Sequence, residues 1–432
     1  MLWQVTVLQS LTVLRRLKFT NLGKVYDIAI IGGGAAGLYA AAALSSYKKE
    51  KGSIEAILLE KMHRCGLKIG ITGKGRCNLT NTKPWNEFAT HIHPKNVFLK
   101  NAFYANSNTA VMENFERMGL PLVVERGDRV FPQTMKALDV VSTLERHILQ
   151  GGVQLRKNSQ VSSLAKSDDG VFVIKCSEGF ECRARKVIVA TGGLSYQTTG
   201  SSGDGYAFAK DLGHKITPLF PSLTALKPKN YKEEFYGISL KNVSVQLSVN
   251  GDVVQEEFGD LDFTNGGIEG PIGFKVSRKG VHSIINGQKV ELRLDMKPAV
   301  SLEQLAKRIE REAAEIKGDK LKGILPKLLP AKLVKLFVEG NNGLSMTNLA
   351  QKLKCWVFPI NDYVGYERCV VTAGGVSLQE VSQKTMESKL VPGLYFAGEV
   401  LDLDGDTGGY NLQIAFSTGA LAAQSAAASL TR

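Results

Sequence analysis

Short apolar runs followed by glycine-rich turns mark the first strands that the chain predicts. The run at 27–31 leads into the turn 32–37 (Gly-Gly-Gly-Ala-Ala-Gly), and an alanine-rich stretch over 35–48 follows. A second apolar run, 54–59, ends at Glu60. Uninterrupted apolar runs of this length are typical of buried parallel strands, whereas the alanine-rich stretch favours a helix. The pattern therefore predicts a strand–helix–strand unit over 27–60.

The same pattern returns further along the chain and again near its end. An apolar run at 186–190 leads into Thr-Gly-Gly, and another at 393–396 leads into Ala-Gly-Glu. The glycine-rich segment 405–419 then runs into a second alanine-rich helical stretch. We therefore expect the two ends of the chain to fold together into one α/β domain.

The middle of the chain has a different pattern from about residue 212 onward. Strand-like runs with turn residues between them occupy 216–294, as at 243–249, 251–258 and 290–294. From 301 to about 353 the apolar residues are spaced by three and four, which predicts helices interrupted at Pro326 and Pro330. We predict an N-terminal extension (1–24), a dinucleotide-binding domain (25–212 and 369–432), an inserted β-rich domain (213–300) and a helical part of the insert (301–368).

The first glycine-rich turn has the spacing G-x-G-x-x-G, formed by Gly32, Gly34 and Gly37. Gly32 permits a tight turn, Gly34 allows a pyrophosphate to approach the backbone, and Gly37 allows the helix to pack closely on the strand. The start of the helix attracts phosphate, and Glu60 can accept hydrogen bonds from a ribose diol. The unit therefore predicts an ADP-binding site, which NAD and FAD would fill equally well.

Two further segments bear on which dinucleotide binds. A helix starting near Asn411 and Leu412 would direct its N-terminal N–H groups at a flavin and stabilise negative charge on the reduced ring. The loop 65–81 (CGLKIGITGKGRCNLTN) interleaves glycines with Lys68, Lys74 and Arg76, and it directly follows Glu60. A loop of this kind suits a wrap around phosphates. The two segments together favour FAD.

Composition and charge describe an ordinary globular protein with a basic surface. The chain has 432 residues, 44% hydrophobic and 22% charged, which excludes a disordered or fibrous chain. Six cysteines without a Cys-x-x-Cys pair predict a reducing, cytoplasmic environment without a structural metal. The net charge of +13 could attract nucleic acid or lipid, but a basic enzyme with anionic cofactors and substrates is the favoured interpretation.

The first 24 residues are basic and contain no acidic residue. Their apolar run precedes the basic residues, the reverse of a secretory signal, and it is too short to span a bilayer. We interpret this segment as an extension that the fold does not need, with an organellar transit peptide as the alternative. No other stretch predicts a membrane span.

Several long motifs resemble a known family of bacterial FAD-dependent oxidoreductases. The family includes the aminoacetone oxidases and a flavoprotein reductase of bile-acid dehydroxylation, and the resemblance extends from about Tyr26 to the end. The motifs that carry it are GKGRCNLTN (73–81), ATGGLSYQTTGSSGDGY (190–206), TAGGV (372–376), TMESK (385–389) and GLYFAGEVLDLDGDTGGYNLQIAFSTG (393–419). The resemblance implies a Rossmann-like FAD-binding domain of the glutathione-reductase type, interrupted by the β-rich and helical insert.

The resemblance and the glycine-rich segments together give the predicted FAD-binding residues. These are Gly32, Gly34, Ala35, Gly37, Glu60, Lys61, Lys68, Arg76, Cys77, Asn78, Val161, Thr191, Gly192, Gly398, Glu399, Gly409, Asn411 and Leu412. The chain departs from the family in its N-terminal extension and at 263–278 (FTNGGIEGPIGFKVSR), where many members carry a histidine and end in Ser-Gly-Pro. A substrate role for the insert is therefore not carried over.

No catalytic residue can be assigned from the sequence. A flavin transfers hydride at N5 without a protein nucleophile. Cys77 could be a redox thiol, but packing against the cofactor is favoured. Tyr196 and Tyr410 could each position substrate or simply pack, and the pair His91-x-His93 is a weak metal signal.

The predicted function is FAD-dependent hydride transfer to or from a small-molecule substrate. No second G-x-G-x-x-G follows a strand, so NAD(P)H would be a transient electron donor without its own domain. The reaction would be either NAD(P)H-dependent reduction or amine oxidation. The alternative is a non-catalytic redox sensor or RNA-associated flavoprotein. No membrane or nucleic-acid partner is expected, and the oligomeric state stays open.

Overall fold

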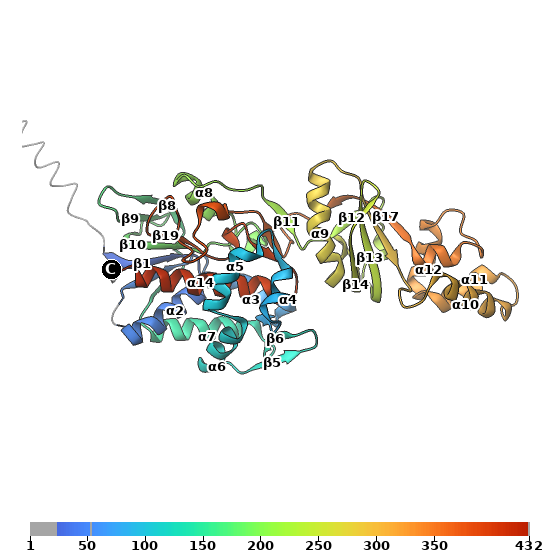
Figure 1. The fold of residues 1–432 in the computed structure, drawn as a ribbon, viewed down its shortest axis with the longest axis horizontal. Coiled ribbons are helices and arrows are strands. Elements are labelled where there is room, and N and C mark those ends of the chain that lie inside the picture. The colour runs from blue at the N-terminus through green and yellow to red at the C-terminus, as the bar shows by residue number, and fades with distance from the viewer. Residues whose placement is uncertain (1–23, 52–53, 431–432) are drawn as a thin grey trace, which may run out of the picture.

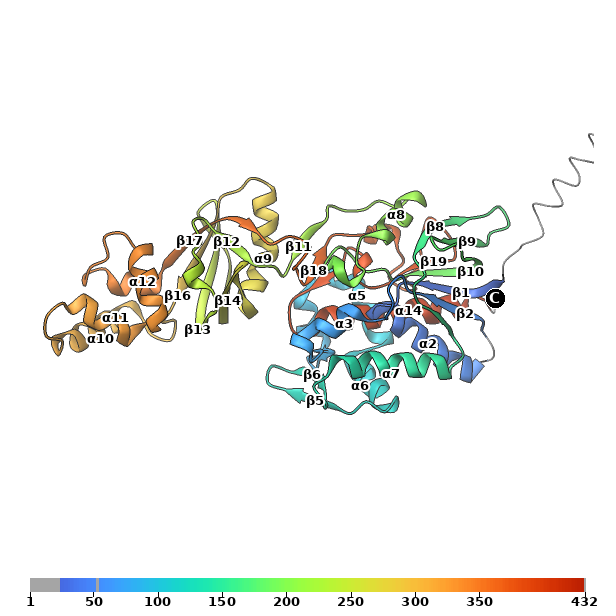
Figure 2. The same ribbon diagram turned by 180° about the vertical axis from the view of Figure 1, so that it is seen from behind.

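The computed structural model describes residues 24–51 and 54–430. The described chain forms an α/β part and, next to it, a β-barrel that carries a group of helices at its far end (Figure 1). The predicted extension 1–24 lies outside the described residues, apart from Lys24. The reverse view shows the same linear arrangement of the three parts (Figure 2).

A seven-stranded sheet forms the centre of the α/β part, with strand order β7-β2-β1-β10-β9-β8 and with β19 also paired to β10. Strands β7, β2, β1, β10 and β19 are parallel, and β9 and β8 continue the sheet antiparallel. The strands are β1 (Val25–Ile31), β2 (Ala56–Leu59), β7 (Gln154–Arg156), β8 (Val161–Lys166), β9 (Phe172–Cys176), β10 (Glu181–Val189) and β19 (Leu394–Phe396). The sheet therefore joins the predicted N-terminal and C-terminal strands.

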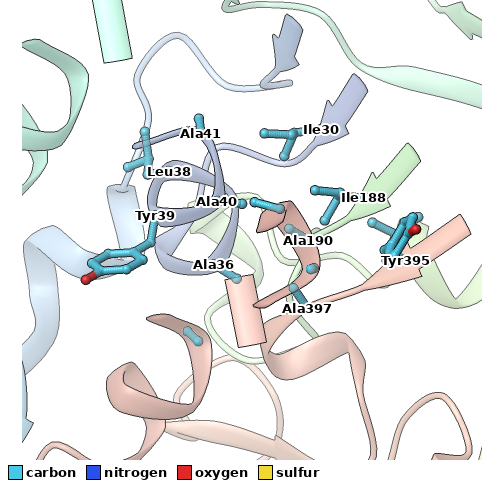
Figure 3. Close-up of a cluster of buried hydrophobic side chains, with 14 of the residues drawn as sticks. Ile30, Ala36, Leu38, Tyr39, Ala40, Ala41, Ile188, Ala190, Tyr395 and Ala397 are labelled. Carbon is cyan, nitrogen blue, oxygen red and sulfur yellow. The ribbon is translucent and has the colours of Figure 1, made fainter. Parts of the chain in front are cut away.

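Helices α2 (Ala35–Lys51), α7 (Ala137–Gln150) and α14 (Tyr410–Ala428) lie together on one side of this sheet (Figure 1). Small residues let α2 and α14 approach closely, since a Cβ at Gly419 would lie 2.4 Å from the Ala36 oxygen. Figure 3 shows Ala36 and Ala40 of α2 in one buried cluster with Ile188 and Ala190 at the sheet and Ala397 after β19. The alanine-rich stretches are thus core helices that bring both chain ends to one place.

Shorter elements fill the connections of the α/β part. They include two small sheets, β3-β6-β5 and β20-β4. The elements are α3 (Leu67–Ile71), η1 (Thr72–Gly75), β3 (Thr80–Asn81), α4 (Trp85–Phe88), η2 (Ala89–His91), β4 (Ile92–His93), α5 (Asn96–Ala105), α6 (Asn108–Arg117), β5 (Leu122–Glu125), β6 (Arg129–Pro132), η3 (Gln197–Thr199), α8 (Asp204–Asp211), η5 (Leu378–Glu380), η6 (Gly398–Val400) and β20 (Asp404–Gly405).

The insert is a closed barrel with strand order β12-β15-β14-β13-β16-β17, with helix α9 packed against it. Its elements are β12 (Leu226–Pro228), η4 (Glu233–Phe235), β13 (Ile238–Val249), β14 (Asp252–Thr264), β15 (Gly267–Glu269), α9 (Gly270–Ile285), β16 (Val290–Asp295) and β17 (Trp356–Tyr363). Four helices lie between β16 and β17: α10 (Leu302–Ala314), α11 (Lys320–Leu328), α12 (Ala331–Gly340) and α13 (Leu349–Lys354).

One segment differs from the predicted division of the insert. Residues 356–363 fall in the range 301–368 that we assigned to helices, yet they form strand β17. In this strand Trp356, Phe358 and Ile360 are buried, while Val357 and Pro359 between them are exposed. This period of two is that of a half-buried strand, and pairing with β12 and β16 closes the barrel.

Two features fix the insert to the α/β part. The chain leaves through β11 (Phe220–Ser222) and returns through β18 (Val371–Ala373), and these strands pair antiparallel. In addition, Arg278 of α9 binds both carboxylate oxygens of Asp404 at 2.9 and 3.0 Å, and the Asp404 side chain is 1% exposed. A bidentate, buried ion pair of this kind sets the orientation of two groups as well as their distance.

Candidate cofactor site

One elongated cavity lies at the carboxyl ends of β1, β2 and β10. Its volume is about 1220 Å³, counting its open mouth. Twelve of the eighteen predicted FAD-binding residues line it: Gly32, Gly34, Ala35, Glu60, Lys61, Lys68, Val161, Thr191, Gly192, Glu399, Asn411 and Leu412. The structure therefore brings together residues from the beginning, the middle and the end of the chain.

The three glycines of the first turn have different surroundings. A Cβ at Gly37 would lie 1.8 Å from the Gly32 oxygen, and one at Gly32 would lie 2.5 Å from the Ala190 oxygen. Both positions are closed by backbone. A Cβ at Gly34 would meet no other atom within 4 Å, although Gly34 lines the cavity. The space before the first turn of α2 is thus open, which suits a phosphate group at a helix N-terminus.

Glu60 lies at the end of β2 with its side chain held in place. One carboxylate oxygen accepts a hydrogen bond from the Gly33 N–H (2.6 Å) and the other from the Met62 N–H (2.7 Å). Burial raises the pKa of Glu60, and these two donors offset only part of that effect. Each carboxylate oxygen can accept a second hydrogen bond, so the acid can still bind a ribose hydroxyl.

A half-buried network in the wall of the cavity joins loop 65–81 to the segment that follows β19. Glu399 accepts hydrogen bonds from Lys68 (2.8 Å), Ser195 (2.5 Å) and the Thr372 N–H (2.9 Å). Burial opposes ionisation of Glu399, but the Lys68 ammonium and the other donors lower its pKa overall. Lys68 and Glu399 were predicted as cofactor contacts, whereas Ser195 and Thr372 were not assigned to the site. Both fall within the motifs 190–206 and 372–376 that carry the family resemblance, and this was the signal available in the sequence.

The Thr191 hydroxyl gives a direct test of whether the cavity fits a polar ligand. Its oxygen is buried and has no hydrogen-bond partner within the described protein, and Thr191 lines the cavity. Buried polar groups rarely lack partners, so this hydroxyl has capacity for a group bound in the cavity. Together with the open space at Gly34, it indicates that the residues present fit a dinucleotide.

The start of α14 forms the other end of the cavity. The Asn411 side chain bonds to the N–H and the carbonyl of Gly405, so its amide holds the preceding loop. The first helical hydrogen bond runs from the Gln413 N–H to the Gly409 carbonyl at 3.1 Å. The N–H groups of residues 410–412 precede it and remain available for an acceptor, as expected for a helix N-terminus.

The loop before α14 is braced by two histidines. Asp406 binds His91 Nδ1 at 2.8 Å and His93 Nε2 at 3.2 Å, and the His91 ring stacks on Tyr410. Burial opposes ionisation of Asp406, but its hydrogen bonds to both histidines lower its pKa to about 2. The pair His91-x-His93 therefore has a bracing role. Among the described residues, no group of three His, Cys, Asp or Glu side chains could hold a metal ion.

Six predicted contacts do not line the cavity: Gly37, Arg76, Cys77, Asn78, Gly398 and Gly409. Arg76 pairs with Glu125 at 3.2 Å and lies over the Phe131 ring. Cys77 is fully buried, and burial raises its pKa to about 12, so it carries a protonated thiol at neutral pH. Whether these six residues contact a cofactor remains a prediction.

The other three of these six support the backbone around the cavity. With its amide turned to face Val130 and Thr80, Asn78 accepts a hydrogen bond from the Gly409 N–H at 3.1 Å. A Cβ at Gly409 would lie 2.5 Å from the Thr80 backbone, and one at Gly398 would lie 2.7 Å from the Ala36 Cβ. Loop 65–81 is thus attached directly to the start of α14.

Comparison with known proteins assigns the family. The HI0933-like protein Rossmann domain family matches residues 26–425. The chain belongs to this family. It is 33% identical over 411 residues to a 3-dehydro-bile acid delta(4,6)-reductase of Clostridium scindens, covering 93% of this chain and 98% of the relative. It is 30% identical over 409 residues to a ribosomal RNA dihydrouridine synthase of Haemophilus influenzae, covering 90% and 95%.

Among solved structures, a 3-ketosteroid delta1-dehydrogenase of Sterolibacterium denitrificans matches with a TM-score of 0.51 at 14% identity, covering 94% of this chain and 100% of that one. This match supports the fold alone. The predicted Rossmann-like FAD-binding fold with its β-rich insert is confirmed, as is the prediction of an FAD-dependent oxidoreductase. None of the described helices has both the length and the hydropathy needed to cross a membrane.

Proposed function

We propose that the protein is an FAD-dependent reductase that adds hydride to a carbon–carbon double bond conjugated with a carbonyl group. The observation that carries the proposal is the cavity that is lined by Gly34 and Glu60 as well as by Asn411 and Leu412 at the start of α14. The name of the Clostridium relative, a delta(4,6)-reductase of a 3-dehydro-bile acid, supports reduction over amine oxidation. The proposed substrate is a small conjugated ketone, and NAD(P)H is the proposed transient donor.

When bound, FAD would supply a two-electron carrier that exchanges hydride at N5. The chain's own residues bind and orient it. The α2 N-terminus at Gly34 would hold the diphosphate, Glu60 would bind the adenosine ribose, and the Thr191 hydroxyl would gain a partner. The N–H groups at the start of α14 would stabilise negative charge by the helix dipole.

The Lys68–Glu399 network would fix the wall of the cavity between these two ends. Since Lys68, Ser195 and the Thr372 N–H all point at one carboxylate, the wall cannot shift without leaving Glu399 without its partners. The raised pKa of Cys77 argues against a thiolate in the reaction. The proposed mechanism therefore uses binding and orientation by the protein and no covalent protein intermediate.

Anaerobic spectroscopy separates the branches of this proposal. We expect purified protein to show flavin absorbance, to bleach on mixing with NADPH or NADH, and to regain colour on addition of a conjugated steroid dienone. Bleaching by a primary amine, with reoxidation by air, would instead support an amine oxidase. A flavin that neither donor bleaches would favour the non-catalytic alternative of a redox sensor.

A second candidate substrate is a uracil base in RNA. The Haemophilus relative is named as a ribosomal RNA dihydrouridine synthase, and saturation of uracil also reduces a double bond conjugated with a carbonyl. The same hydride chemistry would serve both substrates. Incubation with ribosomal RNA and NADPH, followed by mass spectrometry of nucleosides, tests this candidate. Absence of new dihydrouridine, with active reduction of a dienone, would leave the small-molecule substrate.

A further inference from the structure

Helices α11 and α12 carry an unusual run of positive charge. Residues 320–338 (KLKGILPKLLPAKLVKLFV) contain five lysines and no acidic residue. Across 301–354, Lys and Arg number 11 and Asp and Glu number 6, so this segment carries 11 − 6 = +5 of the net charge. The helical part of the insert is thus a concentrated source of the protein's basic character.

All five lysines of this run are exposed: Lys320, Lys322, Lys327, Lys332 and Lys335. Lys320 and Lys327 are seven residues apart and therefore share a face of α11, and Lys332 and Lys335, three apart, share a face of α12. Lys322 and Lys335 have only long ion pairs, at 3.7 and 3.9 Å, with Asp319 and Glu339. Most of this charge is therefore not neutralised within the protein.

The apolar residues of the same helices are already used. Ile324, Leu325, Leu333 and Phe337 are between 0% and 2% exposed, and they belong to a core shared with the barrel. A basic helix that inserts into a membrane needs a free apolar face, which these helices do not have. The surface can therefore attract a partner by charge but has no apolar face to insert.

The position of these helices limits what the partner can be. They lie at the end of the molecule farthest from the central sheet, with the barrel between them and the cofactor cavity (Figures 1 and 2). A small substrate held at the cavity cannot contact them. A long polyanion can, because its charges repeat along its length and it can bind at two distant places at once.

We infer that α11 and α12 form a docking surface for the phosphate backbone of RNA. Lysines that neutralise phosphates release counterions, which gives affinity without sequence specificity. For the chemistry at the cavity, the inference rests on the second candidate substrate of the proposed function, in which one uracil base of the same RNA would be reduced. The Haemophilus relative, which is named for ribosomal RNA, favours RNA as this polyanion.

Matched charge reversals test the surface. One variant carries Lys320→Glu, Lys327→Glu and Lys332→Glu. The control carries Lys100→Glu, Lys210→Glu and Lys384→Glu, three exposed lysines of the α/β part, so both variants have the same net charge. The probe is a fluorescein-labelled RNA hairpin, and its Kd is measured by fluorescence anisotropy. The KCl concentration is varied from about 50 to about 300 mM, so that the dependence of Kd on salt is also measured.

We expect the α11–α12 variant to lose at least about tenfold in affinity and about two units in the slope of log Kd against log salt. The control should change by less than about twofold. Equal losses in both variants, or none in the first, would overturn the inference. Loss of binding to phosphatidylserine vesicles with unchanged RNA binding would also overturn it.

The same samples separate this inference from the proposed function. Flavin content and NADPH-dependent bleaching should be equal in all three proteins, because the altered lysines lie outside the cavity. If bleaching fails in all three but the α11–α12 variant alone loses RNA, the docking surface stands and the reductase proposal falls. If NADPH bleaches the flavin in all three proteins and neither variant loses RNA binding, the reductase proposal stands and the docking surface falls.

Discussion

The cofactor cavity and the α11–α12 surface use charge in opposite ways. In the cavity, Lys68 and Glu399 are 24% and 16% exposed, and each is held at a fixed distance by its partner. On α11 and α12 the lysines are exposed and few of them have close partners. A half-buried charge that is held by fixed partners depends on one geometry, whereas an exposed group of charges acts through its summed charge. Single substitutions should therefore damage the first region and hardly affect the second.

The largest expected effect concerns the open position at Gly34. Because a Cβ there meets no protein atom, Gly34→Val should leave the fold intact and block the diphosphate. We expect at least about a thousandfold loss of FAD affinity, which corresponds to about 4 kcal/mol. Flavin absorbance after purification and thermal unfolding of the flavin-free protein measure the two properties. A yellow variant would show that the cavity is misassigned.

Arg278→Leu should have the next largest effect. This variant breaks the ion pair at the junction of the insert and the α/β part. It leaves the Asp404 carboxylate buried with only Ser222 as a side-chain partner. We expect a loss of about 3 kcal/mol in the free energy of unfolding. Adding Asp404→Asn should recover part of it, since the uncompensated charge is then removed. Urea unfolding measures the free energy of unfolding of the single and the double variant. If both variants lose the same free energy of unfolding, the role of the ion pair is contradicted.

Lys68→Met should lower the free energy of unfolding by less, about 2 kcal/mol, because Glu399 keeps the hydrogen bonds from Ser195 and from the Thr372 N–H. Glu399→Gln in the same protein should restore part of the stability, and the double-mutant cycle gives the coupling between the two side chains. The control is the same substitution in an exposed ion pair, Lys307→Met, whose partner is Glu303. It should alter the free energy of unfolding by less than about 0.5 kcal/mol. Purely additive effects at Lys68 and Glu399 would contradict the network.

The smallest effect is a dependence on pH at the loop before α14. The pKa of Asp406 is lowered to about 2, so its contribution is present above its ordinary value near 3.8 and is lost as the pH falls towards 2. We expect about 1–2 kcal/mol of stability to depend on this group. Asp406→Asn should therefore be less stable than wild type at pH 6, and this difference should shrink as the pH falls below 3.8 and through about 2. A constant difference would argue against ionisation as the cause.

The cavity could be predicted in large part because its chemistry is local in the sequence. Gly32, Gly34, Gly37 and Glu60 all lie within one strand–helix–strand unit, and their spacing is set by the geometry of that unit. The Lys68–Glu399 pair joins positions 331 apart in the chain. Both residues were predicted to contact the cofactor, but no local pattern in the sequence indicates that they form an ion pair. Nor does any local pattern indicate that Ser195 and Thr372 complete the network.

The insert was harder to predict for two physical reasons. Strand β17 follows four helices, and its short alternation at 356–363 resembles the end of the helical stretch until its pairing with β12 and β16 is known. The lysines of α11 and α12 are interleaved mainly with apolar residues, so no two of these lysines are adjacent in the sequence. Only the structure shows that the leucine, isoleucine and valine residues between them are buried or partly buried while all five lysines are exposed.

The chain enters and leaves the insert side by side, through the paired strands β11 and β18. Ser222 and Val371 are direct partners across this ribbon, so their Cα atoms are about 5 Å apart. A tight two-residue linker could therefore splice the chain there and delete the entire barrel and its helices. Because this deletion also removes Arg278, the shortened protein needs Asp404→Asn as well, so the ribbon and the ion pair together define where the insert could be exchanged.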